Sequence, residues 1–179
     1  MKYDETKIKE VLDRVRNEQR EYTVLFDADN TLYRFSTYGR VDEALRDCYN
    51  KGFYKQLPVF PEAPIVVENL QRLGLRVGIA TSILDTPFCE KEKLESFMYH
   101  FPTVDERDIY IIPPGKSKSE VVGDVYDKIL IDDYHANIID WYNAGGLAIK
   151  KTYSGKARPV PQVMSLIELF PLLHELNVY

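Results

Sequence analysis

The length, composition and charge of this chain predict one globular domain. Its 179 residues are 45% hydrophobic and 28% charged, which is enough apolar material to bury a substantial core. The formal charge of -5 argues against a protein that binds nucleic acid polymers, because such proteins present a basic face. No signal-peptide core or membrane-length apolar run is found, so we expect a soluble cytoplasmic protein without a membrane partner. Two cysteines, Cys48 and Cys89, are too few for a disulfide framework.

Hydrophobic periodicity predicts the elements of the first half of the chain. Apolar residues at helical spacing predict a helix over residues 6–20, and residues 22–26 have the composition of a buried strand. Residues 33–58 are rich in aromatic side chains and contain a helical pattern around Leu45. A further amphipathic helix is expected to stop at Gly74, because a helix commonly ends at a left-handed residue.

From residue 76 onward, predicted strands and helices alternate. The strands are expected at 76–80, 109–112, 128–131 and 146–150, and the helices at 90–98, 118–125, 136–142 and 162–173. Residues 151–161 are expected to form a surface loop because of their glycine, proline and serine content. This alternation predicts an α/β fold with a parallel sheet that is covered by helices on both faces.

Polar side chains follow four of the five predicted strands, where each strand ends. In chain order they are Asp27 and Asp29, Thr81 and Ser82, Lys116 and Lys118, and Asp132 and Asp133. Open parallel sheets bind their ligands beyond the carboxyl ends of the strands, so these groups are expected at one edge. Carboxylates, hydroxyls and a lysine gathered there would suit a phosphate group and a hard divalent cation such as Mg2+.

The segment after the first strand carries the strongest signal. Asp27 and Asp29 are two residues apart on an extended segment, so both carboxylates can point toward one site. Neighbouring carboxylates repel each other unless a cation or a shared proton relieves them. A carboxylate beside Mg2+ can also act as a nucleophile that forms an aspartyl phosphate. Taken alone, the segment could equally be a simple turn, because Asp and Asn residues favour turns.

The combined pattern resembles the haloacid dehalogenase (HAD) superfamily of phosphotransferases. Residues 27–31 resemble the first motif of that superfamily, Thr81 its second, Lys118 its third, and Asp132 with Asp133 its fourth. From the residues alone, Lys116 and Lys118 both remain candidates for the third motif. The resemblance favours Lys118, because relatives have two residues between Pro-Pro-Gly and this lysine.

Within the superfamily, the chain looks most like the 5'(3')-deoxyribonucleotidases and the related phage and bacterial 5'-nucleotidases. That branch has a Thr-Ser pair after the second core strand, followed by a cysteine and a Glu-Lys pair, as Cys89, Glu92 and Lys93 stand here. The resemblance covers residues 22–150. Two departures are Asn30 in place of the usual glycine, which turn geometry tolerates, and Ile83 in place of a proline.

The resemblance also implies a domain plan and residue roles. It implies a three-layer core formed by residues 1–32 and 59–179, with a small helical cap inserted at residues 33–58. Asp27 would be the nucleophile, Asp29 the general acid and base, and Lys118 the cation that screens the nucleophile. The ligands of Mg2+ would be Asp27, the backbone carbonyl of Asp29, and Asp132 or Asp133, with Asp133 favoured for direct contact.

The same resemblance assigns the groups that bind the substrate. Thr81, Ser82 and Lys93 would hold phosphoryl oxygens. The aromatic side chains of the predicted cap, among them Phe53 and Tyr54, could stack on a nucleobase, although buried aromatics more often form a core. The expected substrate is therefore a small phosphate monoester, with a nucleotide as the first choice.

The sequence thus predicts a Mg2+-dependent phosphomonoesterase that hydrolyses nucleoside monophosphates through an aspartyl phosphate. The main alternative is a HAD phosphatase that acts on a sugar phosphate or another small phosphoester. A receiver-type phosphoacceptor module fits less well, because its acceptor aspartate follows a later strand. A module that binds without hydrolysis is disfavoured by the presence of both Asp27 and Asp29. The base, the sugar, the choice between 5' and 3' phosphate, and a homodimer all stay open.

Overall fold

A six-stranded parallel sheet forms the centre of the computed structural model, which describes residues 2–36 and 41–179. The strands are β1 (Thr23–Phe26), β2 (Arg76–Ser82), β3 (Ile109–Ile112), β4 (Lys128–Asp132), β5 (Leu147–Lys151) and β6 (Gln162–Val163). Their order across the sheet is β3-β2-β1-β4-β5-β6, and every neighbouring pair is parallel. The predicted α/β fold with a parallel sheet is confirmed.

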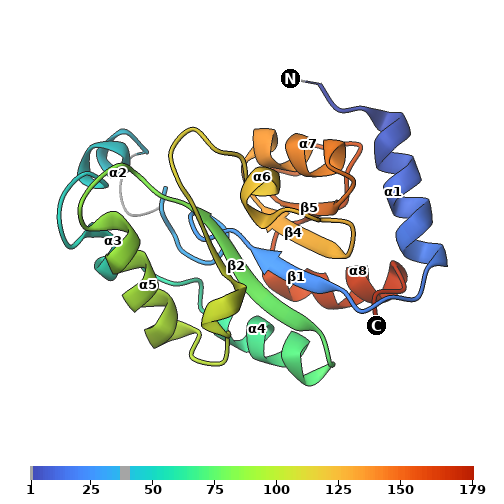
Figure 1. Cartoon of the computed structure of the whole chain (residues 1–179), viewed down its shortest axis with the longest axis horizontal. Helices are drawn as coiled ribbons and strands as arrows, with labels where there is room; N and C mark the ends of the chain where they lie inside the picture. The colour runs from blue at the N-terminus through green and yellow to red at the C-terminus, as the bar shows by residue number, and fades with distance from the viewer. Residues whose placement is uncertain (1, 37–40) are drawn as a thin grey trace.

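Helices cover both faces of the sheet (Figure 1). On one face lie α1 (Glu5–Asn17), α6 (Lys118–Val122) and α7 (His135–Asn143), and on the other α4 (Ala63–Arg72) and α8 (Leu169–Glu175). Strands that are buried on both faces need continuous apolar runs, and the middle residues of β1, β2, β4 and β5 are indeed all buried. Within the described part of the chain, no helix is both long and apolar enough to cross a membrane.

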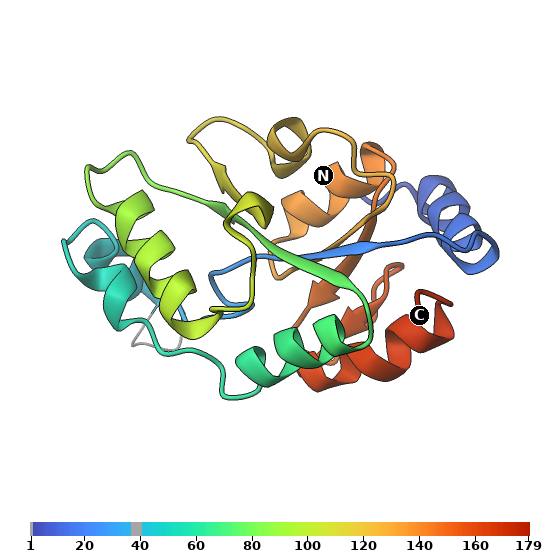
Figure 2. The same ribbon diagram turned by 60° about the horizontal axis from the view of Figure 1, so that its bottom comes forward.

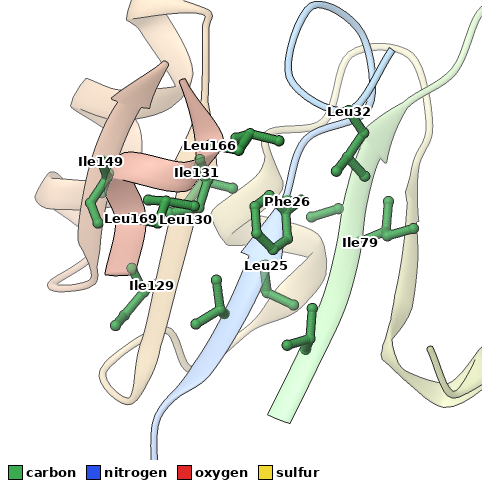
Figure 3. Close-up of a cluster of buried hydrophobic side chains, with 14 of the residues drawn as sticks. Leu25, Phe26, Leu32, Ile79, Ile129, Leu130, Ile131, Ile149, Leu166 and Leu169 are labelled. Carbon is green, nitrogen blue, oxygen red and sulfur yellow. The ribbon is translucent and has the colours of Figure 1, made fainter. Parts of the chain in front are cut away.

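The hydrophobic core fills the space between the sheet and these helices. Figure 3 shows Leu25 and Phe26 of β1 beside Ile131 of β4, with Leu166 and Leu169 approaching from the C-terminal helical segment. Each of these five side chains is fully buried. The segment after β6 therefore completes the core rather than lying over it as a peripheral tail.

The predicted helix end at Gly74 is confirmed by the structure. The helix α4 ends just before Gly74, which has a φ of +88°, the left-handed conformation expected of a helix-ending residue. Trp141 in α7 is fully buried and its indole N–H donates to the carbonyl of Lys128 at 3.3 Å. It is a packing residue.

The predicted helix over residues 162–173 is wrong at its start. Residues 162 and 163 form the edge strand β6, and helical turns begin only with η2 (Leu166–Glu168) and continue in α8. The amide of Lys150 donates to the carbonyl of Pro161, and the amide of Thr152 donates to that of Val163, each at 2.9 Å. The two prolines at 159 and 161 keep the chain extended as it approaches β5, and this outweighs the helical spacing of apolar residues.

Residues 33–58, the predicted cap, lie between the loop that follows β1 and the start of α4, and are called the insertion below. Its ends lie side by side: Tyr33 forms an antiparallel bridge with Val59, and the amide of Arg34 donates to the carbonyl of Pro58 at 2.8 Å. The insertion contains α2 (Val41–Asp47) and α3 (Phe53–Gln56), and α3 packs on α5 (Cys89–His100), as Figures 1 and 2 show. Residues 37–40 of the predicted cap lie outside the described residues.

Candidate active site

Sheet topology places two predicted site segments next to each other. Strand β1 pairs with β2 on one side and with β4 on the other, so the chain order changes direction at β1. Phe26 is in register with Ile131, and the amide of Asp27 donates to the carbonyl of Ile131 at 2.8 Å. Asp27 and Asp132 therefore leave neighbouring strands at the same height. Ligands of open α/β sheets bind at this kind of position.

Lys118 joins these two aspartates. Its ammonium nitrogen lies 2.5 Å from Oδ1 of Asp27 and 2.6 Å from Oδ2 of Asp132, and its side chain is only 1% exposed. The residue stands at the start of α6, which Ser117 and Glu120 fix through a capping box. Burial alone would lower the pKa of Lys118, but the two carboxylates outweigh burial and raise it. The two carboxylates therefore favour the charged form of Lys118.

Asp132 is held in place by further hydrogen bonds. The backbone amide of Tyr134 donates to Oδ1 at 2.7 Å, and the side-chain amide of Asn137 donates to Oδ2 at 2.8 Å. Both oxygens of this fully buried carboxylate are thus occupied by donors. The neighbouring residue Asp133 is held through its backbone carbonyl, which accepts from Lys150, and its carboxylate lies near those of Asp27 and Asp132.

Three carboxylates meet closely enough to hold a metal ion. Oxygen atoms of Asp27, Asp132 and Asp133 all lie within 4.8 Å of one another. Burial raises the pKa of Asp27 well above its usual range, and the charge of Asp132 adds to the effect against the opposing ammonium of Lys118. Burial, followed by the charge of Asp132, raises the pKa of Asp133 to about 7. An all-oxygen donor set with this excess of negative charge fits a hard divalent cation such as Mg2+.

A second cluster forms around Lys93 of α5, on the side of the site that faces the insertion. Its ammonium donates to Oδ2 of Asp29 at 2.7 Å, to the hydroxyl of Thr81 at 2.9 Å and to the carbonyl of Ser82 at 2.9 Å. Lys93 is 2% exposed, whereas the side chain of Asp29 is 30% exposed. The cluster combines one cation, one carboxylate and a hydroxyl. The cation and the hydroxyl can give up their present hydrogen bonds and bind oxygen atoms of a phosphate ester instead.

Most of the predicted site residues thus fall into two adjoining groups. Asp27, Lys118, Asp132 and Asp133 form the first, and Asp29, Thr81 and Lys93 form the second. The side chain of Ser82 is exposed, and within the described residues only its carbonyl joins the second group. The side chain of Asp29 likewise stands outside the three-carboxylate group, so a metal role for this residue would fall to its backbone carbonyl.

The two predicted base-stacking aromatics lie inside the insertion rather than on its surface. Phe53 and Tyr54 are 7% and 3% exposed, and their rings pack edge to face with centroids 5.2 Å apart. The ring of Tyr54 also lies 4.9 Å from the ammonium of Lys93, within cation–π range. A cavity between Tyr54 and Asp29 has a volume of about 10 Å3, room for roughly one water molecule. A nucleobase would need the insertion to move.

Lys116 takes no part in either group. Its side chain is 56% exposed and pairs with Glu120 one helical turn away at 3.3 Å. Both lysines were candidates for the third motif, and Lys118 is the one in contact with Asp27.

Four residues near the site carried no assigned role in the sequence analysis. Asn137 donates to the carboxylate of Asp132, and Lys150 and Tyr153 donate to the backbone carbonyls of Asp133 and Asn30. The fourth, Asn30, accepts from Ser36 of the insertion. Asn30 was visible as a departure from the glycine of the family pattern. Tyr153 gave no signal, because it lies in a segment of loop composition whose fold depends on β5 and β6.

Comparison of folds places this architecture among known structures. A haloacid dehalogenase-like hydrolase from Xanthomonas campestris shares 15% identity with a TM-score of 0.61, and the alignment covers 89% of this chain and 95% of that one. The fold is that of HAD-superfamily hydrolases.

Two further structures show the same relationship. A HAD family hydrolase from Deinococcus radiodurans, with bound phosphate and sodium, has a TM-score of 0.57 at 13% identity and covers 88% of this chain and 97% of its own. The D,D-heptose 1,7-bisphosphate phosphatase from Burkholderia thailandensis has the same TM-score and identity, covering 84% and 98%. No family model and no curated protein matches the sequence. At these identities the similarity defines the fold, and function has to be argued from the site.

Proposed function

We propose that this protein is a Mg2+-dependent phosphatase of the HAD type that hydrolyses small phosphate monoesters, with nucleoside monophosphates as the first candidate substrates. The observation that carries the proposal is the group formed by Asp27, Asp132, Asp133 and Lys118. It puts buried carboxylates, an ammonium and a set of oxygen ligands at the position where open α/β sheets bind ligands, which supports a carboxylate nucleophile.

Asp27 is the proposed nucleophile. One of its oxygens accepts from Lys118, and the other attacks phosphorus, so that the bond to the ester oxygen breaks and an aspartyl phosphate forms. Water then attacks the same phosphorus, the bond to Asp27 breaks, and phosphate is released. Lys118 opposes the rise in the pKa of Asp27 and orients its carboxylate before the attack.

Asp29 is the proposed general acid and base. It gives a proton to the departing ester oxygen and takes one from the attacking water. In the structure, its carboxylate accepts from Lys93. An incoming phosphate dianion would compete for that ammonium and for the hydroxyl of Thr81, which would release Asp29 for proton transfer.

Mg2+ would be held by the carboxylates of Asp27 and Asp133 and by the backbone carbonyl of Asp29, with Asp132 beside them. When bound, it supplies neutralisation of the negative charge on the phosphoryl oxygens. Both oxygens of Asp132 already accept from protein donors, which supports Asp133 as the direct fourth-motif ligand.

The insertion is the proposed cap that selects the leaving group. Its helix α3 packs on α5, which carries Lys93, so it covers the insertion-facing half of the site. The resemblance to deoxyribonucleotidases supports a nucleotide, with Phe53 and Tyr54 as stacking partners once the cap has moved. The similarity in fold to a sugar bisphosphate phosphatase keeps a sugar phosphate as the alternative. A cytoplasmic location and a homodimer also stay predictions.

The deciding experiment measures phosphate release from a panel of 5'- and 3'-nucleoside monophosphates, deoxy and ribo, together with sugar phosphates. We expect turnover with Mg2+ and none with EDTA, and the Asp27→Asn variant serves as the matched inactive control. The ranking of the panel separates the nucleotide from the sugar phosphate. If the folded protein binds Mg2+ and releases phosphate from none of these substrates, the proposal is wrong.

A further inference from the structure

Glu92 of α5 is a buried carboxylate that contacts the insertion. It is 3% exposed, and its Oε1 accepts from the backbone amide of Gly52 at 2.6 Å. Gly52 is the N-cap residue of α3 and has a φ of +93°, a conformation that glycine adopts without strain. The first amides of a helix have no partner inside the helix, so this one is available to an acceptor on α5. The hydrogen bond therefore attaches the start of α3 to α5, which lie side by side in Figure 1.

The other carboxylate oxygen of Glu92 has no such partner. Within the described part of the chain, no group makes a hydrogen bond to Oε2, and this atom is buried from solvent. An unpaired buried polar atom costs more free energy than a single hydrogen bond contributes, and the cost is larger for a charged group. While α3 lies on α5, Glu92 is thus only half satisfied. Movement of α3 away from α5 would let water reach both oxygens.

This contact lies beside the insertion-facing half of the site. The next residue, Lys93, donates to Asp29 at 2.7 Å, and its ammonium lies 4.9 Å from the ring of Tyr54 in α3. The cavity between Tyr54 and Asp29 holds about 10 Å3, so a leaving group larger than a water molecule does not fit there while α3 keeps its place. Room for a large leaving group must therefore be made where Glu92 meets Gly52.

A second contact joins the same two helices at the surface. Lys55 of α3 pairs with Glu95 of α5 at 2.5 Å, and the two side chains are 51% and 44% exposed. Because both partners stay solvated, this pair contributes little to holding α3 in place. The buried carboxylate of Glu92 is the contact whose free energy changes most when α3 moves.

We propose that Glu92 is a positioning residue that sets the size of the leaving group the site admits. Its half-paired carboxylate keeps the packing of α3 on α5 weak enough for α3 to move aside. The inference rests on the proposed function for the class of substrate, a phosphate monoester, and not for the contact between the helices. A site whose competent arrangement is only partly populated binds its ligand in proportion to that population. Glu92 therefore acts on the binding of a nucleoside monophosphate and not on the chemical step.

Glu92→Gln tests the effect on α3 directly. The substitution keeps the size of the side chain and an acceptor for the Gly52 amide, and it removes the charge. The unpaired atom then belongs to a neutral group, which costs less to bury, so α3 should leave α5 less often. We expect the Gly52 amide, followed by NMR in the absence of substrate, to exchange with solvent about tenfold more slowly than in the wild type.

The kinetic readout of the same variant is a split between a large and a small substrate. We expect the KM for deoxyadenosine 5'-monophosphate to rise about tenfold with kcat unchanged, because the competent population falls by that factor. The KM for methyl phosphate should stay within about twofold of the wild type, because a methyl group needs little room. A purely structural role of Glu92 would change both substrates alike.

Glu95→Gln is the matched control. It makes the same substitution one turn further along α5 and removes the charge that pairs with Lys55 at the surface. Exchange of the Gly52 amide and both KM values should stay within about twofold of the wild type, because exposed pairs contribute little.

The inference is overturned if the Gly52 amide of Glu92→Gln exchanges as fast as in the wild type or faster, or if both KM values rise together. Faster exchange would mean that the carboxylate holds α3 in place instead of loosening it. Slower exchange in a protein that releases phosphate from no ester would support the effect of Glu92 on α3 and contradict the proposed function.

Discussion

The two halves of the site are built around two buried lysines with opposite surroundings. Lys118 lies between Asp27 and Asp132 with Asp133 nearby, and Lys150 donates to the carbonyl of Asp133, so that half carries three carboxylates for two ammonium groups. Lys93 lies between Asp29, the hydroxyl of Thr81 and a carbonyl, so that half carries one carboxylate for one ammonium. Their exposures are similar, at 1% and 2%. The two lysines therefore differ in the charge of their surroundings and not in their burial.

The difference in balance indicates a division of labour. The half around Lys118, called the core half below, has excess negative charge that a divalent cation would neutralise. Its acidic side chains lie at the end of β4 or directly after β1 and β4. The insertion-facing half is close to neutral and has an ammonium and a hydroxyl to offer to phosphoryl oxygens. Its carboxylate is 30% exposed, against 11% for Asp27 and 0% for Asp132, as the proposed role in proton transfer to an ester and from water requires.

The largest expected effect sharpens the role of the insertion-facing half. Asp29→Asn removes the proposed proton-transfer group while keeping the size of the side chain and one acceptor oxygen for Lys93. We expect kcat to fall by roughly 100- to 10,000-fold, the range for loss of a general acid or base. Steady-state phosphate release measures this. A variant within tenfold of the wild type would show that Asp29 does not transfer the proton.

The next prediction tests whether Lys118, Asp27 and Asp132 form a buried ion-pair network that stabilises the protein. Lys118→Met removes the ammonium and leaves Asp27 and Asp132 facing each other without a cation. We expect the free energy of unfolding to fall by about 3–5 kcal/mol in metal-free protein, as when one partner of a buried pair is removed. Urea denaturation measures it.

Lys116→Met is the matched control for Lys118→Met. The two lysines are two residues apart, but Lys116 is exposed and pairs only with Glu120 among the described residues. Its replacement should change the unfolding free energy by less than about 1 kcal/mol. Equal effects of the two substitutions would contradict the assignment of Lys118 to the core half.

The smallest effect concerns pH. The pKa of Asp133 is about 7 in the folded protein, mainly because of burial, against about 3.9 for an unfolded aspartate. Between these two values the folded state binds more protons than the unfolded state, so the unfolding free energy of metal-free protein should fall as pH rises from about 4 to 7. The slope attributable to Asp133 is at most about 1.4 kcal/mol per pH unit.

Comparison with Asp133→Asn isolates this contribution from other titrating groups, among them His100, whose pKa is lowered by burial. The variant should show a shallower decline across the same window in denaturation measured at several pH values. Saturating Mg2+ should remove the wild-type decline, because binding requires the deprotonated carboxylate. A slope unchanged by the substitution would contradict the raised pKa of Asp133.

Much of the fold could be predicted from the sequence, because its signals are local. The five long strands are continuous apolar runs, and the helices between them have amphipathic spacing, so their existence follows from periodicity. The weak element was β6, two residues long, whose pairing depends on β5 and on the nearby prolines. An edge strand this short has no periodicity to detect.

The sequence by itself determined which chemical groups reach the carboxyl edge of the sheet. The residues that follow each predicted strand are known from the order of the sequence, and the carboxyl ends of parallel strands lie at the same edge of the sheet. Asp27, Asp29, Thr81 and the pair at 132 and 133 were found in this way.

Only the tertiary structure decided which of these groups touch. Lys118 meets Asp27 across 91 residues of chain, and its choice over Lys116 depends on how α6 docks against the sheet. The burial of Phe53 and Tyr54 and the hydrogen bonds between Asn30 and Ser36 also depend on where the insertion packs. Contacts between distant segments are set by crossover geometry and packing, which a linear pattern does not encode.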